Sequence, residues 1–208
     1  VGHANGLRLS GSQLERNLHT IQEGNALAPT SVPTDGRLRD FTVEMETGTG
    51  KTYCYIRTIY ELNCRYGLTK FIIVVPSVAI REGVKKSFES TKSHFDVLYD
   101  KMPLECFVYD SSKMDRINGF AISSSIQVMI INIGAFDKDN DFDEEEIAES
   151  TGKRDKRNLF HRPSEDLIGG QIPRELVASC NPIVIIDEPQ SVDSTAKRKK
   201  AIRSLNPL

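Results

Sequence analysis

The sequence contains no long uncharged apolar run of the kind that spans a membrane as a helix. Its first residues, Val-Gly-His-Ala-Asn, also lack the basic-then-apolar pattern of a secretory signal. Both absences argue against a membrane or secreted protein, and we expect a soluble, cytoplasmic one without a membrane partner. Because the chain begins at Val1 and stops at Leu208, we also expect it to be part of a longer protein.

An excess of charge of one sign is also missing. The sequence has 27 basic and 29 acidic residues, and its formal net charge is −2. No overall basic field therefore indicates nucleic acid, and any contact with it would need a local patch. With 38% hydrophobic and 27% charged residues, the chain suits one globular domain with a sizeable core.

Cysteine is sparse and lacks a metal-binding pattern. The sequence has four cysteines without a C-x-x-C pair, at Cys54, Cys64, Cys106 and Cys180. Spacing of this kind favours neither a zinc site nor a disulfide framework. We therefore interpret all four as ordinary structural thiols.

The most informative stretch is Met45–Thr52, which reads Met-Glu-Thr-Gly-Thr-Gly-Lys-Thr and is typical of a phosphate-binding loop. Backbone N–H groups that converge from such a turn onto a helix N-terminus bind the oxygens of a nucleoside triphosphate. Only glycine adopts positive φ freely and lets the backbone come close to a phosphate. The predicted ATP site consists of Thr47, Gly48, Thr49, Gly50, Lys51 and Thr52.

Two side chains of this loop have predicted chemical roles. Lys51 is expected to reach the β- and γ-phosphates and to assist catalysis, and the Thr52 hydroxyl is expected to bind Mg²⁺. The loop departs from the full P-loop pattern at one position, because Met45 stands where a first glycine is usual.

Strand and helix patterns alternate along the chain after residue 39. An extended stretch precedes the loop at Asp40–Glu44, and a helix is predicted over Tyr53–Tyr66, ended by Gly67. Apolar runs without alternation are typical of strands buried on both faces of a parallel sheet. Such runs occur at residues 70–75, 107–109, 127–133 and 182–186.

Helical spacing separates these runs. Ile80, Val84 and Phe88 recur every four residues, about a dozen residues between the second and third strands look helical, and a basic helix is predicted over Ala196–Leu205. We interpret the charges of that last helix as a solvated face rather than a DNA site. The sequence therefore predicts an α/β, RecA-like P-loop domain, with a parallel sheet flanked by helices on both faces.

The last apolar run ends in Asp187 and Glu188. In open α/β sheets, the carboxyl ends of the strands form the ligand-binding edge, and the P-loop lies at the same edge. Because a γ-phosphate needs a neutralising metal and an in-line nucleophile, we assign Asp187 to Mg²⁺ and Glu188 to the attacking water.

Two segments carry weaker patterns. Residues 1–39 form a predicted N-terminal segment with a short helix over Gln13–Gln22, followed by a linker, and residues 40–208 form the predicted motor domain. Residues 137–162 combine an acidic block with a basic one and are interpreted as a charged, exposed and mobile insertion. A Mg²⁺ or Ca²⁺ site there is the alternative, although the spacing does not fit a calcium loop.

Three stretches of the chain resemble superfamily 2 helicase-type motors, and more closely the Res subunit of type III restriction enzymes: Met45–Thr52, Val74–Arg81 and Ile185–Gln190. In that superfamily the loop reads x-x-T-G-x-G-K-T, so Met45 accords with it. By this resemblance, a motif that contacts the DNA backbone matches Pro76, Ser77 and Arg81, and a further DNA-contacting motif includes Asn132.

The resemblance implies a first motor domain that couples ATP hydrolysis to movement on double-stranded DNA, for restriction of foreign DNA. It implies a modification (methyltransferase) subunit as a partner of the full-length protein. It also implies that a second RecA-like domain, with its arginine finger, and an endonuclease domain lie outside this chain. We therefore expect the chain alone to be nearly inactive.

Two other functions stay open at this point. Leu167–Gln171, followed by Ile185–Gln190, imitates the signature of an ABC-type ATPase, although Ile168 replaces the signature serine and Pro173 interrupts the next helix. The chain could also be a non-catalytic module that uses a nucleotide fold to bind nucleotide or DNA. A GTPase is excluded because no N-K-x-D motif occurs.

Overall fold

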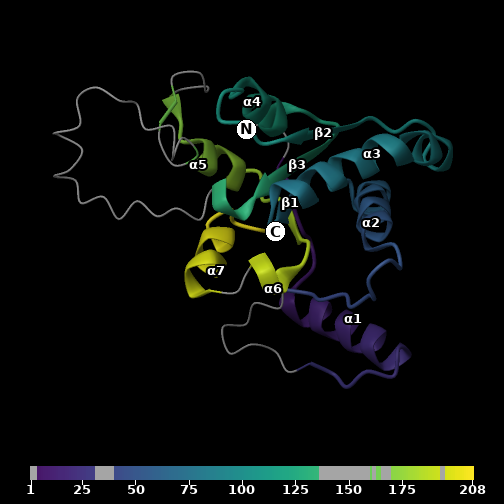
Figure 1. Ribbon diagram of the computed structural model, residues 1–208. Helices are drawn as coiled ribbons and strands as arrows, with labels where there is room; N and C mark the ends of the chain where they lie inside the picture. Colours follow the sequence, from purple (N-terminus) through teal and green to yellow (C-terminus); the bar gives the residue numbers. More distant parts are fainter. Residues whose placement is uncertain (1–3, 31–39, 136–159, 161–162, 165–169, 193–194) are drawn as a thin grey trace.

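The computed structural model describes residues 4–30, 40–135, 160, 163–164, 170–192 and 195–208. Its centre is a parallel sheet in the order β2-β3-β1-β4, flanked by helices on both faces (Figure 1). The four strands are β1 (Lys70–Val75), β2 (Leu104–Val108), β3 (Ile126–Asn132) and β4 (Ile183–Ile186). The α/β class and the parallel sheet predicted from the sequence are confirmed.

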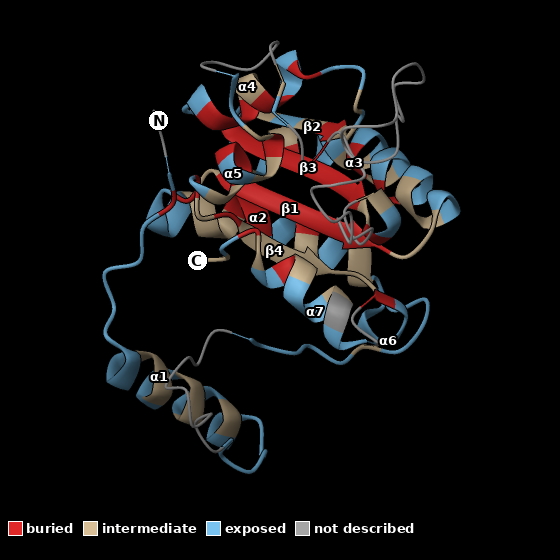
Figure 2. Ribbon diagram, turned by 90° about the vertical axis from the view of Figure 1, so that its left-hand side faces the viewer, coloured by how far each residue is buried: buried red, intermediate tan, exposed pale blue. Residues whose placement is uncertain are grey.

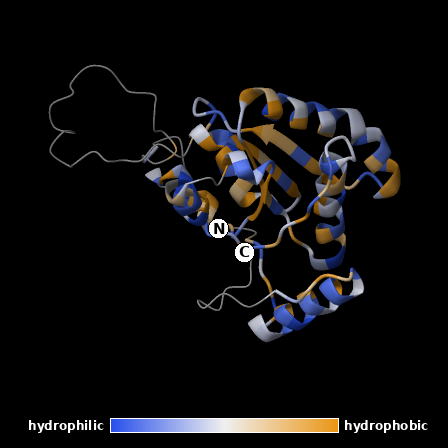
Figure 3. Cartoon of the chain, turned by 60° about the horizontal axis from the view of Figure 1, so that its bottom comes forward, coloured by the Kyte–Doolittle hydropathy of each residue, from blue (hydrophilic) through white to orange (hydrophobic). Residues whose placement is uncertain are grey.

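The helices alternate with these strands along the chain. They are α1 (Gly11–Gly24), α2 (Lys51–Tyr66), α3 (Val78–Leu98), α4 (Asp115–Ile122), α5 (Pro173–Ala178), α6 (Pro189–Val192) and α7 (Ala196–Arg203), with a 3₁₀ turn, η1, at Ile133–Ala135. All of the predicted helices form, with ends that differ from the prediction by a few residues. Figure 3 shows apolar strands at the centre of the molecule and mixed, partly hydrophilic helices around them.

The sheet is buried on both faces because its central strands are apolar throughout. In β1, Ile72 and Val74 pack into a cluster with α4, α5 and α7, whereas Ile73 and Val75 pack with α2 and α3. Each of these four side chains is fully buried, as the red central strands in Figure 2 show. Burying one such side chain stabilises the fold by about 1.5–3 kcal/mol, so β1 anchors both layers.

The two helices on the P-loop side begin and end at residues with clear local causes. Helix α2 ends at Gly67, whose φ of 70° is favourable for glycine. Ile56 and Ile59 of α2 are buried, but Tyr66, at the end of the helix, is 67% exposed. Helix α3 begins after Ser77, which accepts a hydrogen bond from the Ile80 N–H.

One predicted element does not form. Residues 40–44 are outside every strand, and Phe41 and Val43 are 57% and 76% exposed. An extended segment becomes a strand only by hydrogen bonding to a neighbour. None of the four strands pairs with this segment, and the described part of the sheet leaves one edge of β4 unpaired. The strand prediction for Asp40–Glu44 was therefore wrong.

The N-terminal segment is joined to the sheet at Asn5. The Asn5 side chain donates to the Lys70 carbonyl oxygen at 2.8 Å and accepts from the Thr69 N–H at 2.8 Å. The Asn5 N–H donates to the Cys180 carbonyl oxygen at 2.9 Å. Asn5 is 4% exposed, so this residue belongs to the packed domain although the pattern of residues 1–39 carried no such signal.

Helix α1 lies outside the layers, and none of its residues is buried by the described part of the chain (Figures 1 and 2). Its start is fixed locally, because Ser10 and Gln13 form a reciprocal capping box. Ile21, an apolar residue of this helix, is 62% exposed.

The predicted charged insertion lies outside the described residues except for Phe160. This residue is 1% exposed, and its ring meets that of Tyr109 edge-on at 5.0 Å. Phe160 therefore packs in the core. Within the described residues, no helix is long and apolar enough to cross a membrane. The four cysteines are free thiols: Cys54 and Cys64 are exposed, Cys106 is half-buried and Cys180 is buried.

Candidate nucleotide site at the carboxyl edge of the sheet

The predicted phosphate-binding loop adopts a tight, exposed turn before α2. Gly48 and Gly50 have φ values of 82° and 96°, which a side chain at either position would strain. The Thr49 hydroxyl donates to the Glu46 carbonyl oxygen at 2.6 Å and closes the turn. No side chain caps the α2 N-terminus at Gly50 in the described structure, so its first N–H groups are available to an anion.

Lys51 and Thr52 are the first two residues of α2, and both are half-buried. The Lys51 Nζ donates to the Met45 carbonyl oxygen at 3.5 Å, which is long for a hydrogen bond. This weak contact keeps the Lys51 ammonium beside the loop. A phosphate oxygen would easily replace the Met45 carbonyl oxygen as its partner.

Asp187 follows β4 at the same edge of the sheet. Its N–H donates to the Val74 carbonyl oxygen at 3.1 Å and so continues the pairing of β1 with β4 by one residue. Its Oδ2 accepts a hydrogen bond from the Tyr55 hydroxyl at 3.4 Å. The Asp187 carboxylate is therefore oriented toward α2, the helix that starts with Lys51 and Thr52.

Tyr55 contacts Asp187, one of the two residues that the sequence assigned to a metal. Burial raises the pKa of Tyr55 well above its ordinary value, the Thr52 hydroxyl opposes that rise, and the charge of Asp187 adds to it. Tyr55 therefore connects α2, which begins with Lys51 and Thr52, to the end of β4. Tyr55 was not predicted from the sequence, although its place three residues after Thr52 puts both on one helix face.

Glu188 has an unusual backbone conformation. Its φ is 54°, in the left-handed region, where a residue with a side chain is destabilised by about 1–2 kcal/mol. The side chain is exposed, and the Glu188 carbonyl oxygen accepts the Ser191 N–H at 2.9 Å, which starts the short helix α6. Strain of this kind persists where surrounding structure enforces it, and it is frequent at functional sites.

The first predicted DNA-contacting segment follows β1. Pro76 and Ser77 are half-buried, and the Ser77 hydroxyl caps α3 through the Ile80 N–H at 3.3 Å. Arg81, in the first turn of α3, donates to the Glu82 carboxylate at 2.9 Å, and its side chain is 26% exposed. Ser77 thus has a structural role in starting the helix, and Arg81 has an acidic neighbour.

The second predicted DNA-contacting residue, Asn132, ends β3. It lies opposite Val75 of β1, and its side-chain oxygen accepts the Gly134 N–H at 2.9 Å. On the other side of β1, Val74 lies opposite Ile186 of β4. The segments that follow β3, β1 and β4 are therefore neighbours in that order along one edge, so all of the predicted site residues outside the loop lie at this edge.

A cluster of three or more His, Cys, Asp or Glu side chains that could hold a metal by themselves does not occur within the described residues. A magnesium ion in a nucleotide site differs from such a centre, since it is commonly held by one or two protein oxygens together with phosphate oxygens and water. Thr52 and Asp187 offer a hydroxyl and a carboxylate of the type required.

Comparison with known proteins gives a family match over nearly the whole chain. The model of the family described as "Type III restriction enzyme, res subunit" matches residues 14–205. The matched region includes the loop, all four strands and the Asp187-Glu188 pair.

Individual relatives agree with that match. The EcoPI Res subunit of Escherichia phage P1 is 31% identical over 207 residues, which cover 96% of this chain and 21% of the relative. The EcoP15I Res subunit of Escherichia coli is 31% identical over 217 residues, with the same coverage. The StyLTI Res subunit of Salmonella typhimurium is 32% identical over 183 residues, 79% of this chain and 17% of the relative. The chain thus spans about one fifth of the length of these curated relatives.

Proposed function

The chain belongs to the Res subunit family of type III restriction enzymes, and we propose that it is the ATP-binding first motor domain of such a subunit. The observation that carries this proposal is the hydrogen bond between Asp187 and Tyr55, which belongs to the helix that follows the loop. Triphosphate hydrolysis requires a phosphate-binding loop and a metal-binding carboxylate close together, and this hydrogen bond supports such an arrangement.

The side chains present fit a magnesium–ATP complex. The N–H groups at the start of α2 would bind phosphate oxygens, and Lys51 would neutralise the β- and γ-phosphates. Thr52 and Asp187 would hold Mg²⁺, which supplies positive charge to the transferring phosphoryl group. Glu188 would orient or deprotonate the attacking water.

In the whole protein, this hydrolysis would drive movement on double-stranded DNA. Pro76, Ser77, Arg81 and Asn132 lie where the strand ends form a continuous edge, and contacts there would position a DNA backbone without reading its sequence. The relatives are named as subunits of restriction-modification enzymes, so we propose a modification subunit as partner and restriction of foreign DNA as the outcome.

Of the two alternative functions, the non-catalytic module is kept and the ABC-type ATPase is not. The ABC-type ATPase is set aside, because the Res family match covers the chain and Pro173 begins α5 rather than continuing a signature helix. Residues 165–169 of the imitated signature lie outside the described residues. A non-catalytic nucleotide or DNA module stays as the second candidate, since this chain spans only a fifth of its relatives.

The proposal is tested first at the loop. Lys51→Ala should weaken ATP binding at least tenfold, because the triphosphate loses its closest cation, while the circular dichroism spectrum stays unchanged. Lys86→Ala, which removes an exposed lysine of α3, serves as the matched control and should bind ATP normally. Calorimetry that finds the same ATP affinity in the Lys51 variant and in the unsubstituted chain would contradict the assignment.

A further inference from the structure

The residue directly after Thr52 presents a fixed aromatic ring to solvent. Tyr53 stacks on Phe95 of α3, with ring centroids 5.3 Å apart and planes 26° from parallel. Its hydroxyl forms a hydrogen bond with Nε2 of His94 at 2.9 Å. The residue is nevertheless 37% exposed. The His94 ring also lies near the Tyr53 ring, with centroids 5.6 Å apart, so solvent reaches the part of the Tyr53 ring that Phe95 and His94 leave open.

The direction of this ring follows from helix geometry. Residues two apart on an α-helix point about 200° apart around its axis. Tyr55 turns toward Asp187 and the metal end of the proposed site, whereas Tyr53 turns toward α3. A triphosphate held across the start of α2, with its γ-phosphate on the Asp187 side, would therefore direct its nucleoside toward the side of Tyr53.

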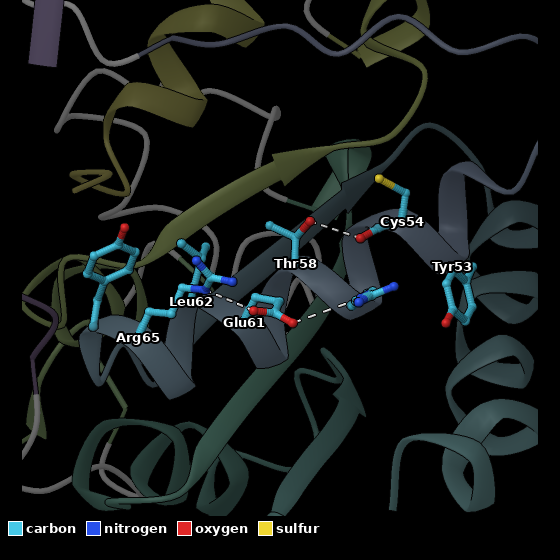
Figure 4. Close-up of a pocket in the computed structure, with 8 residues that line it drawn as sticks. Tyr53, Cys54, Thr58, Glu61, Leu62 and Arg65 are labelled. Atoms are coloured by element: carbon cyan, nitrogen blue, oxygen red, sulfur yellow. Dashed lines mark hydrogen bonds and ion pairs between the residues drawn. The ribbon is translucent and has the colours of Figure 1, made fainter. Parts of the chain in front are cut away.

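A cavity begins at this ring. It has a volume of about 380 Å³ and follows the outer face of α2 from Tyr53 and Arg57 at the loop end to Arg65 and Tyr66 at the other end (Figure 4). Sites for small molecules and cofactors commonly measure about 300–1,000 Å³. The end of the cavity beside Tyr53 is thus next to the proposed phosphate site, and the cavity continues from there along α2.

We propose that Tyr53 is the platform on which the base of the bound nucleotide stacks. This inference rests on the proposed function, because it takes the phosphate site as given. An aromatic ring stacks on any base through its π-face, so Tyr53 would supply affinity without selecting one base. The contacts with Phe95 and His94 hold the ring in place before binding, so little side-chain freedom is lost when a base arrives.

The test compares a nucleotide with a phosphate chain that has no base. Calorimetry with the 208-residue chain measures Mg²⁺–ATP, Mg²⁺–GTP and Mg²⁺–tripolyphosphate against the unsubstituted protein and three variants. Tyr53→Ala removes the ring, and Tyr53→Phe keeps the ring but loses the hydrogen bond to His94. Tyr66→Ala removes an exposed ring about 20 Å farther along α2, too distant to contact the same nucleotide.

We expect Tyr53→Ala to weaken ATP and GTP about tenfold while tripolyphosphate changes less than twofold. Tyr53→Phe keeps the ring stacked on Phe95 but loses the hydrogen bond to His94, so it should lose less than about threefold in ATP and GTP affinity. Tyr66→Ala should bind all three ligands as the unsubstituted chain does. Equal losses for ATP and tripolyphosphate in Tyr53→Ala would overturn the inference, since the ring would then act only on the shape of the loop. Unchanged ATP binding in that variant would also overturn it.

The outcomes separate this inference from the proposed function. If tripolyphosphate binds and Lys51→Ala abolishes that binding, the phosphate site stands whatever Tyr53 does. If the unsubstituted chain binds neither ATP nor tripolyphosphate, the phosphate site is absent and the base platform is overturned with it. Circular dichroism of Tyr53→Ala checks that the lost packing on Phe95 leaves the fold intact.

Discussion

Asp187 and Glu188 are adjacent in sequence, but the backbone gives them different surroundings. Asp187 continues the β1–β4 pairing and accepts a hydrogen bond from Tyr55, so its carboxylate has a fixed direction. Glu188 is exposed and has a positive φ. The fixed direction of the Asp187 carboxylate suits a metal ligand. The exposure of Glu188 suits a residue that acts on water.

Because their surroundings differ, we expect substitution of Asp187 to affect Mg²⁺-dependent ATP binding and substitution of Glu188 to affect turnover. Asp187→Asn should reduce the dependence of ATP affinity on Mg²⁺, because the carboxylate that would hold the ion becomes a neutral amide. Glu188→Gln should leave ATP affinity unchanged and lower turnover by at least about 100-fold, measured in a longer form of the protein that hydrolyses ATP. Equal turnover in Glu188→Gln and the unsubstituted protein would rule out a role on water.

The strained backbone of Glu188 allows a separate prediction about stability. Glu188→Gly should stabilise the chain by about 0.5–1 kcal/mol, since relief of about 1–2 kcal/mol of left-handed strain exceeds the entropy cost of glycine. Urea unfolding followed by circular dichroism measures this change. Turnover should fall as in Glu188→Gln, so stability and activity should move in opposite directions.

The matched control is Asp100→Gly. Asp100 also has a positive φ, of 49°, but it follows α3 at a distance from the site in sequence. Its gain in stability should be smaller, because aspartate tolerates this conformation better than glutamate does, and turnover should be unaffected. A Glu188→Gly variant less stable than the unsubstituted chain would contradict the interpretation of strain.

At the scale of elements, the strand β1 connects both layers through its apolar residues and through one buried cation. Lys70, the first residue of β1, is fully buried; its Nζ donates to the Ser123 carbonyl oxygen at the end of α4 and lies 5.7 Å from the centre of the Phe120 ring. Burial lowers the pKa of Lys70 from its ordinary value of 10.5.

This buried lysine predicts a pH dependence of stability. Between the lowered folded pKa and the unfolded value of 10.5, Lys70 binds more protons in the unfolded chain, so its contribution to the free energy of unfolding should rise with pH in that window. Below the folded pKa, the penalty for burying the charge is present in full. Lys70→Met should remove this rise, which urea unfolding from pH 7 to pH 10 would measure.

Lys86→Met is the control for that measurement, because Lys86 is exposed on α3. Its stability should follow the same pH curve as the unsubstituted chain. If the curves of Lys70→Met and the unsubstituted chain run parallel, the charge of Lys70 is not what makes stability depend on pH.

The elements also show where sequence patterns fail. Continuous apolar runs identified the strands β1, β3 and β4, because burial on both faces leaves no polar alternation. Residues 40–44 (Asp-Phe-Thr-Val-Glu) instead alternate polar and apolar residues, as in a strand buried on one face, and form no strand. A strand requires a partner edge, and local sequence cannot say whether one is available.

At the scale of the whole molecule, the chain corresponds to about one fifth of its relatives. Phosphoryl transfer in related systems gains about 10³–10⁵ in rate from an arginine that neutralises the transition state. Two arginines of this chain are poorly suited to that role, since Arg81 is paired with Glu82 and Arg203 belongs to the terminal helix α7. We therefore expect ATP binding to be weak and DNA-stimulated turnover to be nearly absent.

The corresponding experiment compares this chain with a form extended through a second motor domain. ATP turnover should rise by at least about 1,000-fold in the longer form if an arginine is supplied from there. DNA affinity should also rise and depend more steeply on salt, because more phosphate contacts release more counterions. Equal turnover and equal DNA affinity in both forms would show that this chain is not half of a two-domain motor.

The sequence by itself determined the class of the fold and the glycine positions of the loop, and it predicts the chemistry of that loop. Gly48 and Gly50 are required by local backbone geometry, and the burial of β1 follows from its composition, so both can be identified without knowledge of distant residues. Asp187 was predicted as a Mg²⁺ ligand in the same way, from its place after an apolar run, and that role stays a prediction.

Only the tertiary structure decided which distant groups meet. Tyr55 lies 132 residues from Asp187, and Asn5 lies 65 residues from Lys70, yet each pair is hydrogen-bonded. The part of the Tyr53 ring that solvent reaches depends on its stacking against Phe95 of α3. The left-handed conformation of Glu188 depends on the turn into α6. Contacts of this kind depend on how strands and helices pack, which local periodicity does not encode.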